Sequence, residues 1–143
     1  MKTTFYKLIP ALLFLISFSG CKGNAPENPT DLTGTSWKLA GIYDVQSETL
    51  TVLEPIDCDD CYTLTFDSDT TATGNSTSNL VFVNFSTTNQ IIGIATEVGE
   101  VGDGYIFCNA TIQVTSYSVS KTELKFFFNE KNNYLLYKPK KQC

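Results

Sequence analysis

The chain has 143 residues, with ten lysines, fifteen acidic residues, no arginine and no histidine, so its formal net charge is −5. An acidic domain without guanidinium groups is poorly suited to nucleic acid, and we expect no nucleic-acid partner. Without histidine, the commonest general base and metal ligand is missing, so we expect no enzyme, metal site or cofactor, although Asp, Glu, Lys and Tyr chemistry stays open.

The first 20 residues have the order of a secretory signal peptide. A basic start and an apolar run over residues 8–18 precede two small residues and then Cys21. The run is too short for a membrane-spanning helix, which needs about 20 apolar residues. Residues 18–21 resemble the lipobox of bacterial lipoproteins, with Phe18 where leucine is usual. This resemblance implies cleavage before Cys21 and lipid, such as palmitate, on that cysteine.

Cleavage at this point divides the chain into three parts. We expect a signal peptide over residues 1–20, a lipidated tether over 21–31, and one domain over 32–143. The tether is rich in Gly, Asn and Pro and cannot build a regular element. Eight lysines and fifteen acidic residues remain, so the net charge becomes −7. The lipobox implies a lipid-anchored protein of the bacterial cell envelope, in the outer membrane on its periplasmic or surface face.

The domain reads as a series of short strands. Alternating apolar and polar residues, bounded by turn residues, predict strands near 36–41, 49–53, 61–66, 70–74, 80–85, 91–95, 116–120, 123–128 and 134–137. Residues 105–114 have helical spacing but contain β-branched residues, so we expect a short helix near 104–113 or an irregular crossing. The fold class is mainly all-β: a single antiparallel β-barrel or sandwich of about seven to nine strands.

Two aromatic residues are candidates for contact with a ligand or partner. Trp37 is the only tryptophan, and we expect it to anchor the core at the first strand, with ligand stacking as the alternative. The run from Phe126 to Phe128 must place at least one ring on the outer face of its strand, because successive side chains alternate. Phe127 is the candidate for that ring, either covered or part of a binding patch.

The four cysteines that remain after Cys21 predict two disulfides in an exported chain, with three possible connectivities. A local bridge between Cys58 and Cys61 would leave Cys108 to pair with Cys143. We favour Cys58–Cys143 with Cys61–Cys108, because Cys61 starts a core strand and Cys143 is the chain end.

Two other cysteine chemistries are weaker. A redox role for the Cys58–Cys61 motif is disfavoured, because the two intervening aspartates raise thiol pKa values. A four-cysteine zinc site lacks a second closely spaced pair. The nearby Asp67–Thr71 segment resembles the start of a calcium-binding loop. The glycine at the sixth and the glutamate at the twelfth position of such a loop are missing, so we expect a turn there.

Several short motifs are similar to the META domain family of small bacterial lipoproteins. They are Leu32–Trp37, Tyr62–Asp67 followed by Gly74, Val114–Val119 followed by Leu124–Phe126, and Tyr134–Tyr137. The family usually has a Gly-Cys-Asn-like segment after that glycine, whereas this chain has Asn75–Asn79. The resemblance implies a small β-barrel-like fold without established catalytic residues. A lipocalin-like barrel fits the same strand count.

These features predict a lipid-anchored envelope lipoprotein with a non-enzymatic role. Besides the membrane that holds its anchor, its partner would be an apolar small ligand or another envelope protein. The alternative is an envelope-stress or structural protein that contacts other envelope proteins without a small ligand. An open apolar cavity would favour a carrier, and a filled interior with an exposed aromatic patch would favour a protein partner.

Overall fold

The computed structural model describes residues 31–85, 91–95 and 99–141, and for 91–95 it describes only the backbone. The described elements are β1 (Ser36–Asp44), β2 (Thr49–Thr51), β3 (Thr63–Phe66), β4 (Thr71–Asn75), β5 (Leu80–Phe85), β6 (Ile91–Ala95), α1 (Gly104–Ile112), β7 (Ser116–Val119), β8 (Leu124–Phe128), a 3₁₀ turn (Asn129–Lys131) and β9 (Asn133–Pro139). This confirms the mainly β fold, its strands and its short helix.

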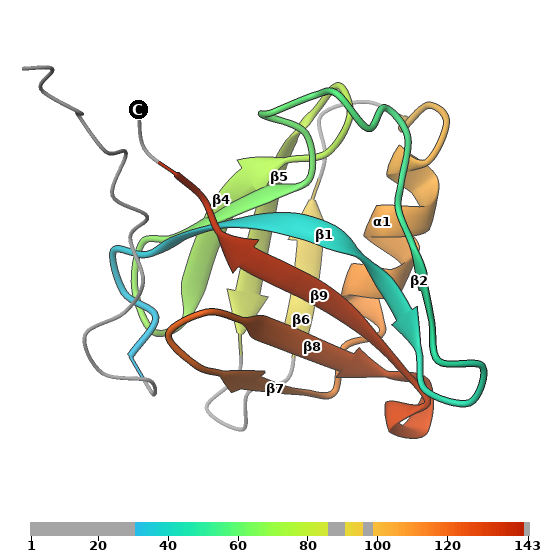
Figure 1. Cartoon of the computed structure of the whole chain (residues 1–143). Coiled ribbons are helices and arrows are strands. Elements are labelled where there is room, and N and C mark those ends of the chain that lie inside the picture. The colour runs from blue at the N-terminus through green and yellow to red at the C-terminus, as the bar shows by residue number, and fades with distance from the viewer. Residues whose placement is uncertain (1–30, 86–90, 96–98, 142–143) are drawn as a thin grey trace, which may run out of the picture.

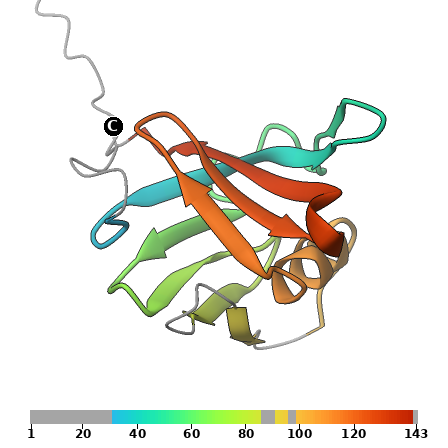
Figure 2. The same cartoon turned by 90° about the horizontal axis from the view of Figure 1, so that it is seen from below.

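All strands within these ranges join one antiparallel sheet. The order is β6-β5-β4-β3-β1-β9-β8-β7, and β2 pairs with the far end of β1 beyond β3. Figure 1 shows β1 and β9 side by side across the molecule. Figure 2 shows the sheet curling, so that β8 and β9 (orange and red) lie across from β4 and β5 (green). The expected barrel is therefore present as a curled half-barrel.

The core lies inside this curl and is built largely from aromatic rings. Phe126 of β8 packs edge-on against Phe66 of β3 and Phe85 of β5, with ring centroids 6.4 and 5.8 Å apart. It also meets Tyr137 of β9 at 5.4 Å. Because β8 and β5 are far apart in strand order, these contacts hold the two halves of the sheet together.

Helix α1 packs beside β6 and covers one end of the half-barrel (Figure 1). Its Phe107 is fully buried and lies 5.3 Å from the ring of Tyr62. Thr111, also buried, donates its hydroxyl hydrogen bond to the carbonyl oxygen of Phe107. Packing of these side chains outweighs the weak helix propensity of the β-branched residues. In the described part of the chain, no helix has the length and apolar character needed to cross a bilayer.

The cysteine pairing differs from the favoured expectation. Cys58 and Cys61 form a disulfide with their Cα atoms 5.4 Å apart, and Cys108 is a free thiol. The favoured pairing of Cys61 with Cys108 is therefore wrong, as is that of Cys58 with Cys143. The tight turn over residues 58–61 brings its two ends within bridging distance, and the Cys61 amide donates to Cys58 Sγ. Cys143 itself lies outside the described residues.

A buried carboxylate joins the start of α1 to the turn between β4 and β5. Glu100 is only 6% exposed. It accepts hydrogen bonds from the Ser76 hydroxyl at 2.6 Å and the Asn79 side-chain amide at 3.0 Å. Burial raises the pKa of the Cys108 thiol to about 11, and Glu100 adds to the shift through its charge and a hydrogen bond. The thiol is thus held in its unreactive protonated form.

A glycine in β4 supplies the first testable prediction. A Cβ atom at Gly74 would overlap the backbone carbonyl of Thr63 on the neighbouring strand. Gly74→Ala should therefore lower the free energy of unfolding by about 1–3 kcal/mol. Urea unfolding followed by fluorescence of the buried Trp37 measures this. Gly99→Ala is the control, because its Cβ would meet only the Tyr105 hydroxyl at 3.4 Å; equal losses in both variants would contradict the packing.

The raised pKa of Cys108 supplies the second prediction. Since the thiol pKa rises from 9.0 to about 11, its thiolate fraction at pH 8 falls about a hundredfold. Alkylation of Cys108 by iodoacetamide, followed by peptide mass spectrometry, should be slower than in urea by about that factor. The folded rate should keep rising up to about pH 11, whereas the unfolded rate levels off above its lower pKa. Similar rates in both states would disprove the burial of the thiol.

Candidate functional site

The structure separates the two aromatic candidates. Trp37 is fully buried, and its indole N–H donates to the Thr35 hydroxyl at 2.7 Å. Its role as a core anchor is confirmed, and ligand stacking is wrong because the ring has no exposed surface. Phe127 lies on the outer face of β8 and is half-buried, as the alternation of the three phenylalanines predicts. Phe126, its neighbour, points into the core.

Phe127 belongs to a row of side chains that crosses four strands. Its ring centroid lies 5.5 Å from that of Tyr134 on β9, and Tyr134 stacks on Tyr43 of β1 at 4.9 Å. Leu50 of β2 lies opposite Tyr43 in the register and is exposed. We call these four residues the aromatic row. With strands about 4.8 Å apart, the row is about 14 Å long.

Strand pairing places these residues on one face. Tyr43 pairs with Tyr134, and Tyr134 pairs with Phe127. Their neighbours Leu135 and Phe126 are fully buried. Because successive side chains of a strand point to opposite faces, burial of these neighbours directs the row outward. The row is therefore a consequence of core packing and register.

Charged groups border the row. The Lys125 ammonium lies 5.1 Å from the Tyr134 ring centroid and 3.3 Å from a Glu123 carboxylate oxygen. Asp44, at the end of β1, accepts hydrogen bonds from the amides of Ser47 and Gln46 and from Asn133. These bonds, that of the Ser47 amide first, lower the pKa of Asp44, so it is ionised at neutral pH. An apolar centre with a charged border is typical of protein interfaces.

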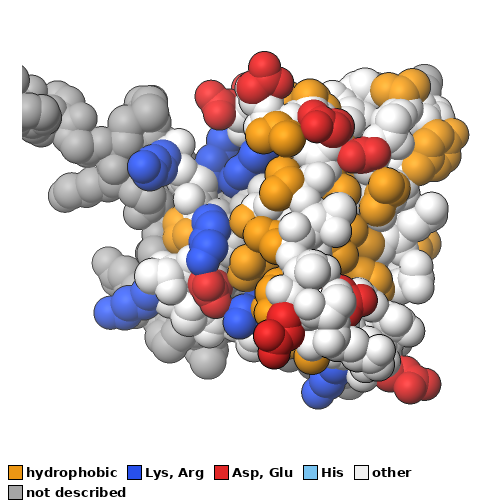
Figure 3. Space-filling model, turned by 45° about the vertical axis from the view of Figure 1, so that its right-hand side comes forward, with side chains coloured by type: hydrophobic (Ala, Val, Ile, Leu, Met, Phe, Trp, Pro, Cys, Tyr) orange, Lys and Arg blue, Asp and Glu red, His pale blue; other side chains and the backbone are white. Residues whose placement is uncertain are grey.

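The Leu50 end of the row lies on the side of the molecule that carries β2 and α1, and this side is rich in exposed apolar residues. Figure 3 looks toward the side that carries β2 and α1, and orange side chains gather on it. The exposed large hydrophobic residues of these elements and their flanking segments are Val45, Leu50, Val52, Ile56, Val101, Tyr105, Ile106 and Ile112. The Glu54 amide donates to Asp103 at 2.8 Å and so ties the segment after β2 to the start of α1.

The remaining predicted site residues lie elsewhere. Cys21 and Cys143 fall outside the described residues, the Cys58–Cys61 disulfide closes a loop beside β1 and β3, and Cys108 lies on α1. Among the described residues, no group of three or more potential metal-ligating side chains comes together. Tyr43, Tyr134 and Leu50 were not predicted as site residues. Only the register between strands distant in sequence reveals them.

Comparison with known proteins gives a structure of similar fold and a relative of similar sequence. No family model matches the chain, so the META resemblance stays a prediction. A crystal structure of a DUF4847 family protein from Bacteroides vulgatus matches with a TM-score of 0.56 at 14% identity. That match covers 78% of this chain and 96% of the other, and it shows the fold alone.

A relative from Tannerella forsythia, named "Putative lipoprotein", is 43% identical over 141 residues. This match covers 96% of the present chain and 97% of the relative, so the two proteins correspond over nearly their whole lengths. The chain belongs to the family of this Tannerella forsythia lipoprotein.

Proposed function

We propose that the protein is an envelope lipoprotein, lipidated at Cys21, that binds another envelope protein through the aromatic row and has no enzymatic role. The observation that carries this proposal is the pairing of a filled interior with half-buried aromatic rings on the outer face. Tyrosine and phenylalanine are enriched at the centres of protein interfaces. Neither similar protein is named for an enzymatic activity.

The anchor is supported by two observations. The signal peptide ends in a lipobox-like segment at Cys21, and the Tannerella forsythia relative carries a lipoprotein name. Both are consistent with a cell-envelope location. An outer-membrane location and kinship with the META family stay predictions.

The filled interior favours a protein partner over a small apolar ligand. Trp37, Phe66, Phe107, Phe126 and Tyr137 are fully buried and occupy the space that a carrier would leave open. The two surface hollows near the disulfide loop are lined largely by polar and charged side chains. Polar atoms make up about half of the surface that lines each hollow, whereas a site for a lipid-like ligand is predominantly apolar.

Charge near the row favours a protein over a bilayer surface. Asp44 stands at the end of β1, and Glu130 lies in the turn between β8 and β9. Lys125 and Lys131 lie in the same region but are outnumbered by Asp44, Glu123 and Glu130, so an anionic bilayer gains no net attraction there. A protein surface can instead supply matching donors around the aromatic centre.

Site-specific crosslinking tests the partner. Phe127 replaced by p-benzoylphenylalanine, in the lipidated protein in its own envelope, should give one discrete adduct on irradiation. Tyr43→Ser with Tyr134→Ser should reduce that adduct more than about tenfold, because central interface tyrosines each contribute about 2 kcal/mol.

A matched position on the other half of the sheet gives the control. Phe82 on β5 is also outward and exposed, so the same probe there should not give this adduct. Phe82→Ser should leave the Phe127 adduct unchanged. Identical adducts from both positions, or an adduct that survives the double tyrosine change, would contradict the proposal.

The anchor has its own prediction. Cells grown with an alkyne fatty acid should incorporate the label into the wild-type protein, and Cys21→Ala should abolish it. Cys143→Ser is the control and should keep full labelling. Label retained in the Cys21 variant would show that another residue carries the lipid.

A further inference from the structure

We propose that a lysine-lined groove at the start of β1 and the end of β9 contacts the anionic surface of the bilayer that holds the anchor, and so orients the domain. This inference rests on the lipid anchor of the proposed function. It concerns a surface distinct from the aromatic row.

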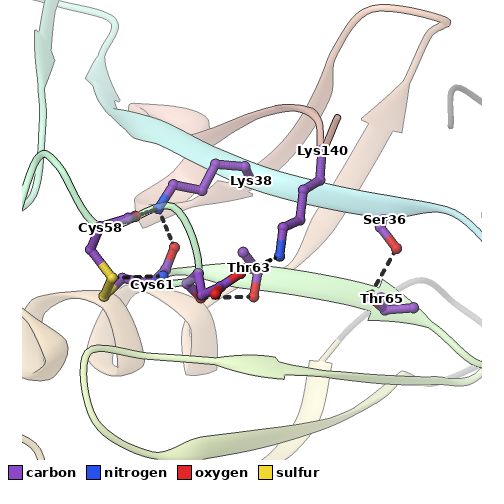
Figure 4. Close-up of polar contacts among 8 residues, drawn as sticks. Ser36, Lys38, Cys58, Cys61, Thr63, Thr65 and Lys140 are labelled. Carbon is purple, nitrogen blue, oxygen red and sulfur yellow. Dashed lines mark hydrogen bonds and ion pairs between the residues drawn. A yellow bond between two sulfur atoms is a disulfide. The ribbon is translucent and has the colours of Figure 1, made fainter. Parts of the chain in front are cut away.

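The groove is formed where β1, β3 and β9 meet the Cys58–Cys61 disulfide loop. Figure 4 shows Lys38 reaching from β1 toward the Cys58–Cys61 loop, and Lys140 pointing across β1 toward β3. The groove is lined by Ser36, Lys38, Asp59, Asp60, Thr65, Lys138, Pro139, Lys140 and Lys141. Lys38 donates to the carbonyl oxygens of Cys58, at 2.6 Å, and of Cys61. The loop carbonyls thus hold one ammonium group in the groove wall.

The other lysines are free to exchange partners. Lys140 pairs with Asp60 at 2.7 Å, and Lys138 pairs with Glu123 at 2.7 Å. Each pair has an exposed partner, since the Lys138 side chain is 49% exposed and the Asp60 side chain is 79% exposed. Exposed ion pairs stabilise a fold weakly, so lipid phosphates can replace these carboxylates at little cost.

Charge is distributed unevenly over the domain. The groove has four of the eight lysines that remain after cleavage before Cys21, but only two of the fifteen acidic residues. An anionic surface attracts the groove and repels the rest of the chain, and both effects turn the groove toward the bilayer. Burial raises the pKa of Tyr117 on β7, and the negative charges of Asp69 and Asp31 add to this shift, so both carboxylates lie toward that strand.

The tether brings the groove within reach of the bilayer. Asp31 is ten positions after Cys21, so the folded domain begins at most about 35 Å from the anchor. The chain then enters β1 at Ser36, whose carbonyl oxygen accepts a hydrogen bond from the Lys140 amide. The groove thus begins five positions after Asp31, at most about 17 Å from the point where the tether joins the domain. Tyr134 lies four residues before Lys138 on β9, about 13 Å further along the same outer face.

Lysine footprinting of the lipidated protein tests this contact. The protein is placed in vesicles of phosphatidylcholine alone or in vesicles that also contain about 30% anionic phosphatidylglycerol, which is the only difference between the two samples. Acetylation of each lysine is then followed by peptide mass spectrometry. Lys138, Lys140 and Lys141 should react about fivefold more slowly in the anionic vesicles, and Lys121 and Lys131 should not change. High salt should remove the difference.

Two variants of equal net charge complete the test. Lys140→Gln with Lys141→Gln should abolish the protection of Lys138, whereas Lys121→Gln with Lys131→Gln should preserve it. Equal acetylation of the groove lysines in both vesicle types would overturn the inference. Failure of the protein to float with phosphatidylcholine vesicles would instead overturn the anchor, so the two failures are distinguishable.

Discussion

Packing of Phe126 across the curled sheet is the interaction on which the remaining architecture depends. Its ring meets Phe66 and Phe85, which come from the other half of the sheet, and Tyr137 from the neighbouring strand. With Phe126 directed inward, strand alternation directs Phe127 outward. The pairing of β8 with β9 then sets Tyr134 beside Phe127, and β1 adds Tyr43. The core therefore determines where the outer aromatic row lies.

The outer face of β1 and β9 has two chemically different zones. Lys38 and Lys138 pair at the end near the tether, and Tyr43 and Tyr134 pair at the other end. The first zone suits an anionic surface and the second suits a protein. A domain anchored beside its basic zone would present its aromatic zone away from the bilayer. One strand pair can thus serve both attachment and recognition.

Local pattern was enough to predict most of the fold. Alternation and turn residues indicated each strand of the described sheet, and helical spacing left a short helix or an irregular crossing for the segment that forms α1. The three consecutive phenylalanines required an outward ring, and the structure confirms Phe127 in that place. These features depend on neighbouring residues, which a sequence displays directly.

Features that depend on distant contacts could not be predicted. Cysteine number allows three pairings, and only the tight turn at residues 58–61 shows that the local bridge forms. Tyr43 and Tyr134 stand 91 positions apart, so their stacking depends on a register that the sequence does not display. The lysine groove likewise joins β1 to β9 and to the disulfide loop.

Side-chain footprinting in the intact envelope tests the central claim most directly. Hydroxyl radicals oxidise accessible aromatic rings, and the rings can be compared between the purified lipidated protein and the protein in its own membranes. The proposed partner predicts that Tyr43, Tyr134 and Phe127 lose oxidation in the envelope, whereas exposed Phe82 and Tyr105 do not. Equal oxidation of the aromatic row in both samples would contradict a partner bound there.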